Sequence, residues 1–255
     1  CKKNEIEFYS KSIDVKKLAH TKKIGEEEAG RIARYEFFEE VLKNTNATKI
    51  AVAHNKNDKI ETMLMNTLRG SGIEGLKGIE PKRDNIIRPL IQCERTEIEK
   101  YCKENKLNPR MDQTNFENTY TRNKIRNVVI PYIQKEFNPN IIKTLDRLSD
   151  IVMGENEYIE NQIKIIYEKI LIEEKPNKEI RIDLKMFNLL ETVIKARLIR
   201  YIIKRLFGST NSIEKIHIED IIKLCGNNIG NKYLTPNKNS KVLIKNHQVH
   251  FIVLS

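Results

Sequence analysis

ATKIAVAHNKNDKIETMLMNTLRG, residues 47–70, is the stretch that decides the fold. Its first part is a short apolar run, typical of a strand that is buried on both faces. A helix is predicted over residues 57–70, with Asn57 or Asp58 as its N-cap. The polar residues from His54 onwards therefore follow the carboxyl end of a buried strand, where α/β proteins gather their ligands.

The segments on either side repeat the alternation of strand and helix. Residues 6–14 alternate in polarity and contain aromatic side chains, as in a strand, and residues 26–45 have apolar side chains at helical spacing. Residues 85–109 predict a short strand and then a helix that starts near Arg95. Such alternation is typical of an α/β domain with a parallel sheet and helices on both faces, which we place over residues 1–118.

A second, mainly helical domain is predicted over residues 119–255. It opens with a basic and apolar helical stretch at 119–137, and a long helical pattern follows from about 140 to 175. The tail at 241–254 predicts two short strands joined at Asn-His, which makes a closing hairpin.

The composition favours a polyanionic partner and a reducing compartment. The chain has 46 Lys and Arg against 35 Asp and Glu, and the net charge of +11 favours nucleic acid. A Lys-, Ile- and Asn-rich proteome is the alternative explanation of that charge.

The four cysteines form no CxxC pair and have no histidine at metal spacing, so they suggest neither a zinc site nor a disulfide framework. No apolar run reaches the roughly 18 residues of a membrane span. No signal peptide is recognisable either, so we expect a cytoplasmic protein without a membrane partner.

Two charged pairs at helical spacing are candidates for chemistry. Asp58 and Glu61 are three residues apart on one predicted helix face, where their carboxylates are able to hold Mg²⁺ or orient an amine. The alternative is an N-cap with a first-turn acid. Arg122 and Arg126 are four residues apart, where two guanidinium groups are able to grip phosphate. The alternative for this pair is a surface salt bridge.

The turn LRGSGIEGL, residues 68–76, contains Gly70, Gly72 and Gly75, which permit close approach of the backbone to a ligand. It is not a Walker A loop, because no Gly-Lys-Ser/Thr follows. An ordinary helix C-cap and loop is the alternative.

A basic amphipathic helix is predicted near residue 200. Apolar residues recur at helical spacing, while Arg197, Arg200 and Lys204 lie on the remaining surface with Lys195 and Arg205. This surface is either a track for nucleic-acid phosphates or a solvated face.

An ordered series of short segments resembles tRNA(Ile)-lysidine synthetase, a family of N-type (PP-loop) ATP pyrophosphatases. The segments are RYEF (34–37), AHNKNDKIET (53–62), LRGSGIEGLKG (68–78), IIRPL (86–90), RTEIEKYCKE (95–104), DQTN (112–115) and TRNKIR (121–126). The resemblance implies an adenine nucleotide alpha hydrolase-like domain, incomplete at its N-terminus. The later region looks like the family's helical tRNA-recognition domain.

The resemblance also implies a reaction. ATP and Mg²⁺ are used to adenylate the C2 oxygen of the wobble cytidine in tRNA(Ile) with a CAU anticodon. The ε-amine of free lysine then displaces AMP, and lysidine is formed. The family likeness further suggests a homodimer.

The resemblance assigns roles to individual residues. Asp58 is expected to position lysine or a metal ion, with Glu61 as its helper. His54 is expected to line the ATP and cytidine pocket. Arg34 and Arg126 are expected to contact phosphate or the adenylated intermediate. Arg122 is a second candidate for the same role. Gly70, Gly72 and Gly75 are expected to border the nucleotide pocket. The residues expected to contact tRNA are Asp112, Asn115, Arg197, Arg200 and Lys204.

Two departures from the family pattern qualify these expectations. Where the family commonly reads HHxDDQ, this chain has Asn55, Asn57 and Lys59, so Asp58 stands alone. The family's SGGxDS phosphate loop does not occur, and we expect it in a segment before Cys1, so that this chain by itself is expected to be inactive. The alternatives are another PP-loop tRNA-modifying enzyme, such as a 2-thiolation ligase, and a non-catalytic basic RNA-binding module. The absence of CxxC pairs counts against the thiolation ligase.

Overall fold

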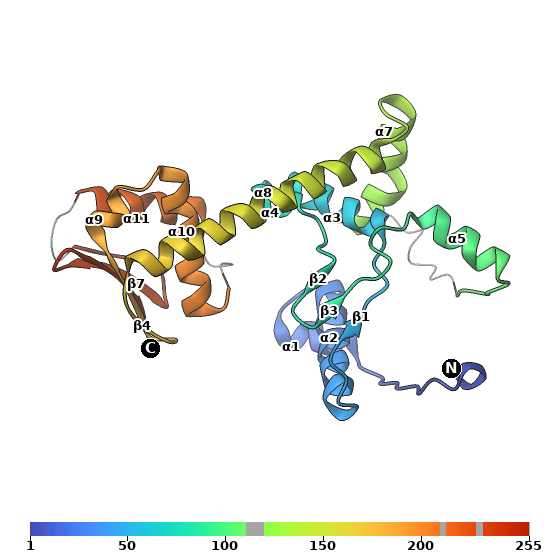
Figure 1. Cartoon of the computed structure of the whole chain (residues 1–255). Helices are drawn as coiled ribbons and strands as arrows, with labels where there is room; N and C mark the ends of the chain where they lie inside the picture. The colour runs from blue at the N-terminus through green and yellow to red at the C-terminus, as the bar shows by residue number, and fades with distance from the viewer. Residues whose placement is uncertain (111–119, 210–212, 228–231, 255) are drawn as a thin grey trace. The chain divides into compact units, whose positions relative to one another are not determined.

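The computed structural model describes residues 1–110, 120–209, 213–227 and 232–254. The chain divides into two compact units, Cys1–Val152 and Met153–Ser255 (Figure 1). The division falls inside the long helix α8 (Ile141–Ile170), so residues 120–152 group with the first unit. The domain boundary expected at 118/119 stays a prediction.

The first unit is mainly helical in its described parts. Its elements are η1 (Lys2–Asn4), α1 (Val15–Lys22), α2 (Glu26–Asn44), β1 (Ile50–Ala51), α3 (Lys56–Leu68), α4 (Ile73–Leu76), β2 (Lys82–Arg83), β3 (Ile86–Ile87), α5 (Arg95–Glu104), α6 (Thr121–Lys124), the π-helical turn η3 (Ile125–Val129), α7 (Ile130–Glu136) and the start of α8.

Three short strands form a sheet in the order β1-β3-β2. β1 and β3 are parallel, with Ile50 opposite Ile86, whereas β2 runs antiparallel to β3. The predicted parallel arrangement is therefore seen for one strand pair among the described residues. The prediction of a strand at 6–14 was wrong, because these residues are exposed and pair with no described strand. Alternating polarity makes a strand only where a neighbouring strand satisfies its backbone groups.

Helix α3 starts earlier than the sequence predicted, because Asn55 is its N-cap. The Asn55 side chain accepts a hydrogen bond from the backbone N–H of Asp58, and the Asp58 carboxylate accepts one from the backbone N–H of Asn55, each at 3.0 Å. This capping box corrects the assignment of Asn57 or Asp58 as the N-cap. Asn57 instead accepts a hydrogen bond from the backbone N–H of Arg95, at the start of α5.

A small core in the first unit joins α3 to the helices that follow residue 120. Ile60 is fully buried against Ile125, Ile130 and Ile142. Beside this core, the side chain of Lys59 is 1% exposed and its ammonium group lies between two carboxylates of α8. Apolar packing and a buried ion cluster thus place α3 against α6, the π turn and α8.

The second unit is built on a five-stranded sheet in the order β4-β5-β8-β7-β6, and its neighbouring strands run antiparallel. Its elements are the end of α8, β4 (Leu171–Lys175), β5 (Glu179–Asp183), α9 (Leu184–Asn188), α10 (Thr192–Phe207), α11 (Lys215–Asn227), β6 (Tyr233–Asn237), β7 (Ser240–Lys245) and β8 (Gln248–Val253). The core contains Ile182, Val249 and Phe251 of the sheet together with Leu198 and Ile202 of α10.

The predicted hairpin at 241–254 is confirmed as β7 and β8. Asn246 and His247 form its turn with φ of 48° and 58°, the left-handed conformation that a two-residue hairpin turn requires. The prediction of a mainly helical domain overlooked the remaining strands. Residues 171–175 were assigned to the end of a helix but form β4, because their backbone groups pair with β5. That pairing is not visible in local periodicity.

None of the helices within the described ranges combines the length and the apolar character needed to cross a membrane.

Candidate active site

Two carboxylates of α3 meet two guanidinium groups from the α6–η3 segment. Arg126 Nε and Nη2 lie 2.6 Å and 2.8 Å from the two carboxylate oxygens of Glu61, which is a bidentate pairing. Arg122 Nε donates to Glu61 Oε2 at 2.9 Å. Asp58 Oδ1 accepts from Nη2 of Arg126 at 3.0 Å and from Nη2 of Arg122 at 3.3 Å. Both predicted pairs therefore converge in one group of four side chains, the acid–arginine cluster.

The members of the acid–arginine cluster differ in their access to solvent. The Glu61 side chain is 1% exposed, whereas that of Asp58 is 15% exposed and those of Arg126 and Arg122 are 21% and 28% exposed. The hydrogen bond to Glu61 raises the pKa of Arg126, with the charges of Glu61 and Asp58 adding to it and burial opposing it. Glu61 thus anchors the two arginines, and the arginines and Asp58 form the accessible part.

The two arginines lie in α6 and in the π-helical turn that follows it. Arg122 lies in α6 and Arg126 in η3, with Ile125 between them buried at 1% exposure. A π turn inserts an extra residue into a helix and occurs frequently at functional sites. Here both guanidinium groups bond to Glu61 of α3, while Ile125 lies in the core.

A cleft of about 440 Å³ lies beside this cluster and contains Arg122 in its wall. Its lining includes five arginines and two glutamates, so it favours an anionic ligand. The lining residues are Glu27, Arg31, Arg34, Tyr35, His54, Thr62, Gly78, Ile79, Glu80, Arg83, Arg88 and Arg122. Arg31 is also paired with Glu28 of its own helix through two hydrogen bonds of 2.8 Å.

His54 and Arg88 are in direct contact within this cleft. Arg88 Nε donates to His54 Nδ1 at 3.1 Å. Burial lowers the pKa of His54, the charge of Asp58 raises it, and the charges of three arginines lower it further. Sequence reasoning singled out His54 but not Arg88. The available signal was an arginine inside the apolar run IIRPLI, since a buried charge has to be paired and is seldom accidental.

The predicted glycine turn encloses the end of α3, and its three glycines do not line this cleft. Gly70 follows α3 with φ of 75°, Gly72 is the N-cap of α4, and the carbonyl of Gly75 accepts a hydrogen bond from Asn66 at 3.0 Å. Gly78, from the same motif, does line the cleft. Its φ is 63°, and an added Cβ would lie 2.6 Å from the carbonyl oxygen of Lys59. Glycine is therefore required there.

The predicted Mg²⁺ position at Asp58 stays a prediction. Both of its carboxylate oxygens accept protein hydrogen bonds, and no group of three His, Cys, Asp or Glu side chains with ligand geometry occurs in the described ranges. The predicted residues Asp112 and Asn115 lie outside those ranges.

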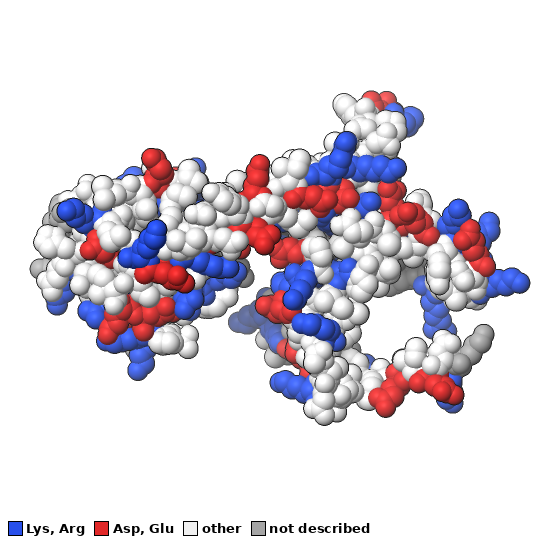
Figure 2. Space-filling view, viewed as in Figure 1, with Lys and Arg blue, Asp and Glu red and all other residues white. Residues whose placement is uncertain are grey.

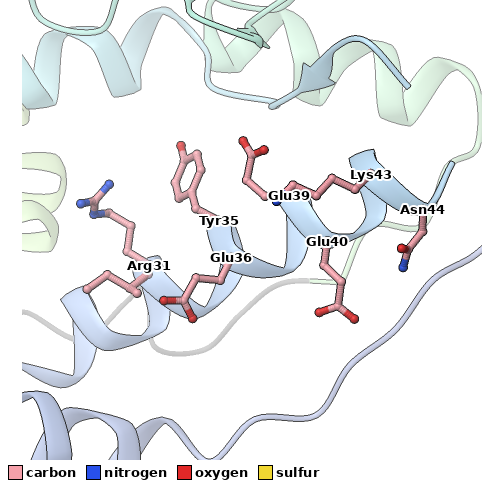
Figure 3. A pocket seen from close by; sticks show the side chains of 8 residues that line it. Arg31, Tyr35, Glu36, Glu39, Glu40, Lys43 and Asn44 are labelled. Atoms are coloured by element: carbon pink, nitrogen blue, oxygen red, sulfur yellow. The ribbon is translucent and has the colours of Figure 1, made fainter. Parts of the chain in front are cut away.

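A larger hollow of about 570 Å³ runs along α2 (Figure 3). All of its lining residues belong to this helix, and they carry charges of both signs. Tyr35 and Glu39 point to one side of the helix in Figure 3, whereas Glu36 and Glu40 point to the other. Glu39 is held by a 2.9 Å hydrogen bond from Asn85. Because all of its lining residues belong to one helix, this hollow is a helix surface rather than a reaction site.

The basic helix of the second unit is α10, and part of its charge is paired internally. Arg205 donates two hydrogen bonds to Glu174, and Arg197 donates one to Asn156. The side chains of Arg200 and Lys204 have no hydrogen bond or ion pair with another described residue. On the face drawn in Figure 2, basic side chains are interspersed with acidic ones. The contact of α10 with nucleic-acid phosphates stays a prediction.

Comparison with known proteins decides the family. A family model described as a PP-loop domain matches residues 1–133, more than half of the 255 residues. The chain belongs to the PP-loop domain family. The adenine nucleotide alpha hydrolase-like α/β class expected for its first part is thereby supported, as is the use of ATP.

Relatives of this PP-loop protein agree with the resemblance noted in the sequence. It is 47% identical over 238 residues to the tRNA(Ile)-lysidine synthase of Clostridium acetobutylicum, covering 93% of this chain and 51% of that protein. It is 43% identical over 251 residues to the tRNA(Ile)-lysidine synthase of Clostridioides difficile, covering 98% and 54%. The chain thus spans about half the length of these curated relatives.

Proposed function

We propose that the protein containing this chain is an ATP-dependent ligase that joins lysine to C2 of the wobble cytidine in tRNA(Ile) with a CAU anticodon. The observation that carries the proposal is the acid–arginine cluster beside an arginine-lined cleft, in a PP-loop domain. The similarity to lysidine synthases over most of the chain supports the choice of substrates.

The proposed reaction has two steps. The C2 oxygen of cytidine attacks the α-phosphorus of ATP and pyrophosphate leaves. The ε-amine of lysine then attacks C2, AMP leaves with the former C2 oxygen, and the amine loses a proton. The first step requires cations that stabilise charge on phosphate, and the second requires a group that positions the amine and accepts its proton.

The arginines meet the first requirement in this proposal. Arg34 and Arg122 line the cleft, and Arg126 shares its carboxylate partners with Arg122. Because Glu61 is buried and bound to both Arg122 and Arg126, we assign it the role of holding them. It acts through them rather than on the substrate.

Asp58 meets the second requirement. It is the more exposed carboxylate of the cluster, and α3 begins beside it, so its position is fixed by the capping box. An ordinary lysine ammonium has a pKa of about 10.4, so it must give up a proton before it attacks. We propose that Asp58 orients that ammonium near the cleft and helps remove the proton.

The remaining partners are proposed mainly on family likeness. We propose that Mg²⁺ enters with ATP and takes most of its ligands from phosphate and water, which is its usual preference, rather than from Asp58. We propose that tRNA contacts Arg200 and Lys204, with Arg197 nearby, and that Asp112 and Asn115 lie toward the same substrate. The homodimer is a proposal of the same kind.

The test is incorporation of labelled lysine into a tRNA(Ile) transcript with a CAU anticodon by the full-length protein that contains this chain. Incorporation is expected to require ATP and to be abolished by Asp58→Asn and by Arg126→Ala. The matched controls are Asp84→Asn and Arg147→Ala, which change the same residue types at exposed positions outside the cluster and the cleft.

Lack of any ATP-dependent incorporation by the full-length protein would refute the proposed function. Full activity of both Asp58→Asn and Arg126→Ala would instead refute the assignment of the site. Retained tRNA binding without incorporation would favour the RNA-binding module.

A further inference from the structure

Arg88 is a buried arginine, and one of its hydrogen bonds is donated to His54 in the cleft. It follows β3 and is only 6% exposed. Its backbone N–H donates to the carbonyl of Pro81 at 2.9 Å, and its Nη1 donates to the carbonyl of Glu80 at 2.6 Å. These two contacts fix the guanidinium, and its Nε–H is directed at Nδ1 of His54 at 3.1 Å.

This contact restricts the protonation of His54. A guanidinium group only donates hydrogen bonds, so Nδ1 must accept with a lone pair. In the Nδ1–H tautomer and in the doubly protonated cation, the Nδ1–H of His54 would point at the Nε–H of Arg88, and no hydrogen bond could form. The form compatible with Arg88 is the neutral ring with its proton on Nε2, and Nε2 has no hydrogen bond to any of the described residues.

We propose that Arg88 is a positioning residue that holds His54 as the neutral Nε2–H tautomer. In this form His54 donates a hydrogen bond from Nε2 to a phosphate oxygen in the cleft and does not act as a base or as a cation. The phosphate class follows from the arginines in the cleft wall. The inference deepens the proposed function, on which it depends only for the identity of the ligand.

The surroundings of His54 support the neutral form. The charged groups that face it are Asp58 of α3, Arg34 of α2, Arg122 of α6 and Arg88 itself, and the cleft also contains Glu27, Arg31, Glu80 and Arg83. Burial is the largest influence and lowers the pKa of His54, and three facing arginines stand against the single carboxylate of Asp58. His54 therefore stays neutral at pH values where an ordinary histidine, of pKa about 6.5, is becoming protonated.

The tautomer is tested by NMR of protein labelled with ¹⁵N-histidine, using long-range ¹H–¹⁵N correlations of the imidazole rings. The five histidines are assigned by substitution, with His54→Gln identifying the relevant signals. We expect His54 to show a proton on Nε2 and none on Nδ1, and to keep this pattern as the pH falls through about 6.5, the ordinary pKa of histidine. A proton on Nδ1, or protonation at the ordinary pH, overturns the proposal.

Substitution of Arg88 tests whether this residue sets the tautomer of His54 or only supports the fold. In Arg88→Met we expect a mixture of tautomers and a higher pKa for His54. The matched control Arg83→Met removes a guanidinium from the same cleft that does not contact His54, and it should leave the tautomer unchanged. An unchanged His54 spectrum in Arg88→Met overturns the role of Arg88. If this variant does not fold, the wild-type spectrum still decides, since it reports the tautomer directly.

The donor role is tested with AMP and with inorganic pyrophosphate as probes. Either probe is expected to shift the Nε2–H signal of His54 in the wild-type protein. Absence of a shift with both probes overturns the phosphate contact. These spectra need neither tRNA nor lysine, so their outcome is independent of whether lysine incorporation is observed.

Discussion

Lys59→Met isolates the contribution of a buried charge to the stability of the first unit. In the sequence, Lys59 is noticed only because it departs from the family's HHxDDQ pattern. The ammonium of Lys59 lies 2.8 Å from Asp146 Oδ1 and 2.7 Å from Asp150 Oδ1. Methionine keeps much of the apolar stem and removes the charge. The substitution therefore leaves the packing of α3 largely in place and withdraws a cation from two carboxylates of α8.

The expected cost follows from the exposure of each partner. Asp146 is 11% exposed and keeps only Lys56, whose ammonium is 3.5 Å away, whereas Asp150 is 49% exposed and becomes solvated once Lys59 is replaced. Removing one partner of a buried pair costs about 3–5 kcal/mol, and the remaining Lys56 ion pair reduces the expectation to about 2–3 kcal/mol. For Asp150→Asn, which removes an exposed partner, we expect about 0.5 kcal/mol or less.

The pairing itself is tested by combining substitutions. Lys59→Met with Asp146→Leu replaces both buried charges by apolar groups, so the double variant should be less destabilised than the sum of the two single variants. The reasoning assumes that the penalty comes from a carboxylate left without its partner, rather than from poorer packing.

The assay is urea unfolding followed by circular dichroism, because the chain has no tryptophan, together with amide hydrogen exchange read by mass spectrometry. Peptides from α3 are expected to exchange about 30- to 150-fold faster in Lys59→Met, since each 1.4 kcal/mol is a factor of ten. Peptides from α10, in the other compact unit, serve as the internal control. A change below about 1 kcal/mol, or a double variant as unstable as the sum, would refute the argument.

Further predictions concern both units. Gly208→Ala should lower the free energy of unfolding by about 1–2 kcal/mol. The added Cβ would meet no neighbouring atom, but the φ of 73° is unfavourable for a residue with a side chain. Gly78→Ala should lower the free energy of unfolding by more, as measured by urea titration, because the added Cβ would also lie 2.6 Å from the carbonyl oxygen of Lys59 in α3. Burial raises the pKa of Cys225 to about 12, so iodoacetamide should label it only when the second unit unfolds, and mass spectrometry at increasing urea gives the order of events. Arg200→Glu and Lys204→Glu should each weaken tRNA binding, and each should reduce the slope of log K against log salt by about one for every phosphate that the protein no longer neutralises. If filter binding gives unchanged salt dependence for both variants, the basic surface of α10 is a solvated face.

The sequence predicted part of the site because some of its signals are local. The spacing of Asp58 and Glu61 places them on one helix face, and that of Arg122 and Arg126 does the same. The match of the quoted motifs to lysidine synthases is supported by the relatives. Arg88 was missed, although its place in the apolar run IIRPLI indicates burial, because its contact with His54 spans 34 positions and is not encoded locally.

What the sequence by itself determined was the approximate position of several helices, the closing hairpin and the family. Capping, helical periodicity and a two-residue turn all depend on neighbours within a few positions. The tertiary structure alone decided which segments pair. Residues 6–14 have the pattern of a strand without forming one, and residues 171–175 form one through β5. Glu61 meets Arg122 across 61 positions, and Lys59 meets Asp146 across 87. Ion pairs and strand ladders require partners brought together by packing, which is a property of the folded chain.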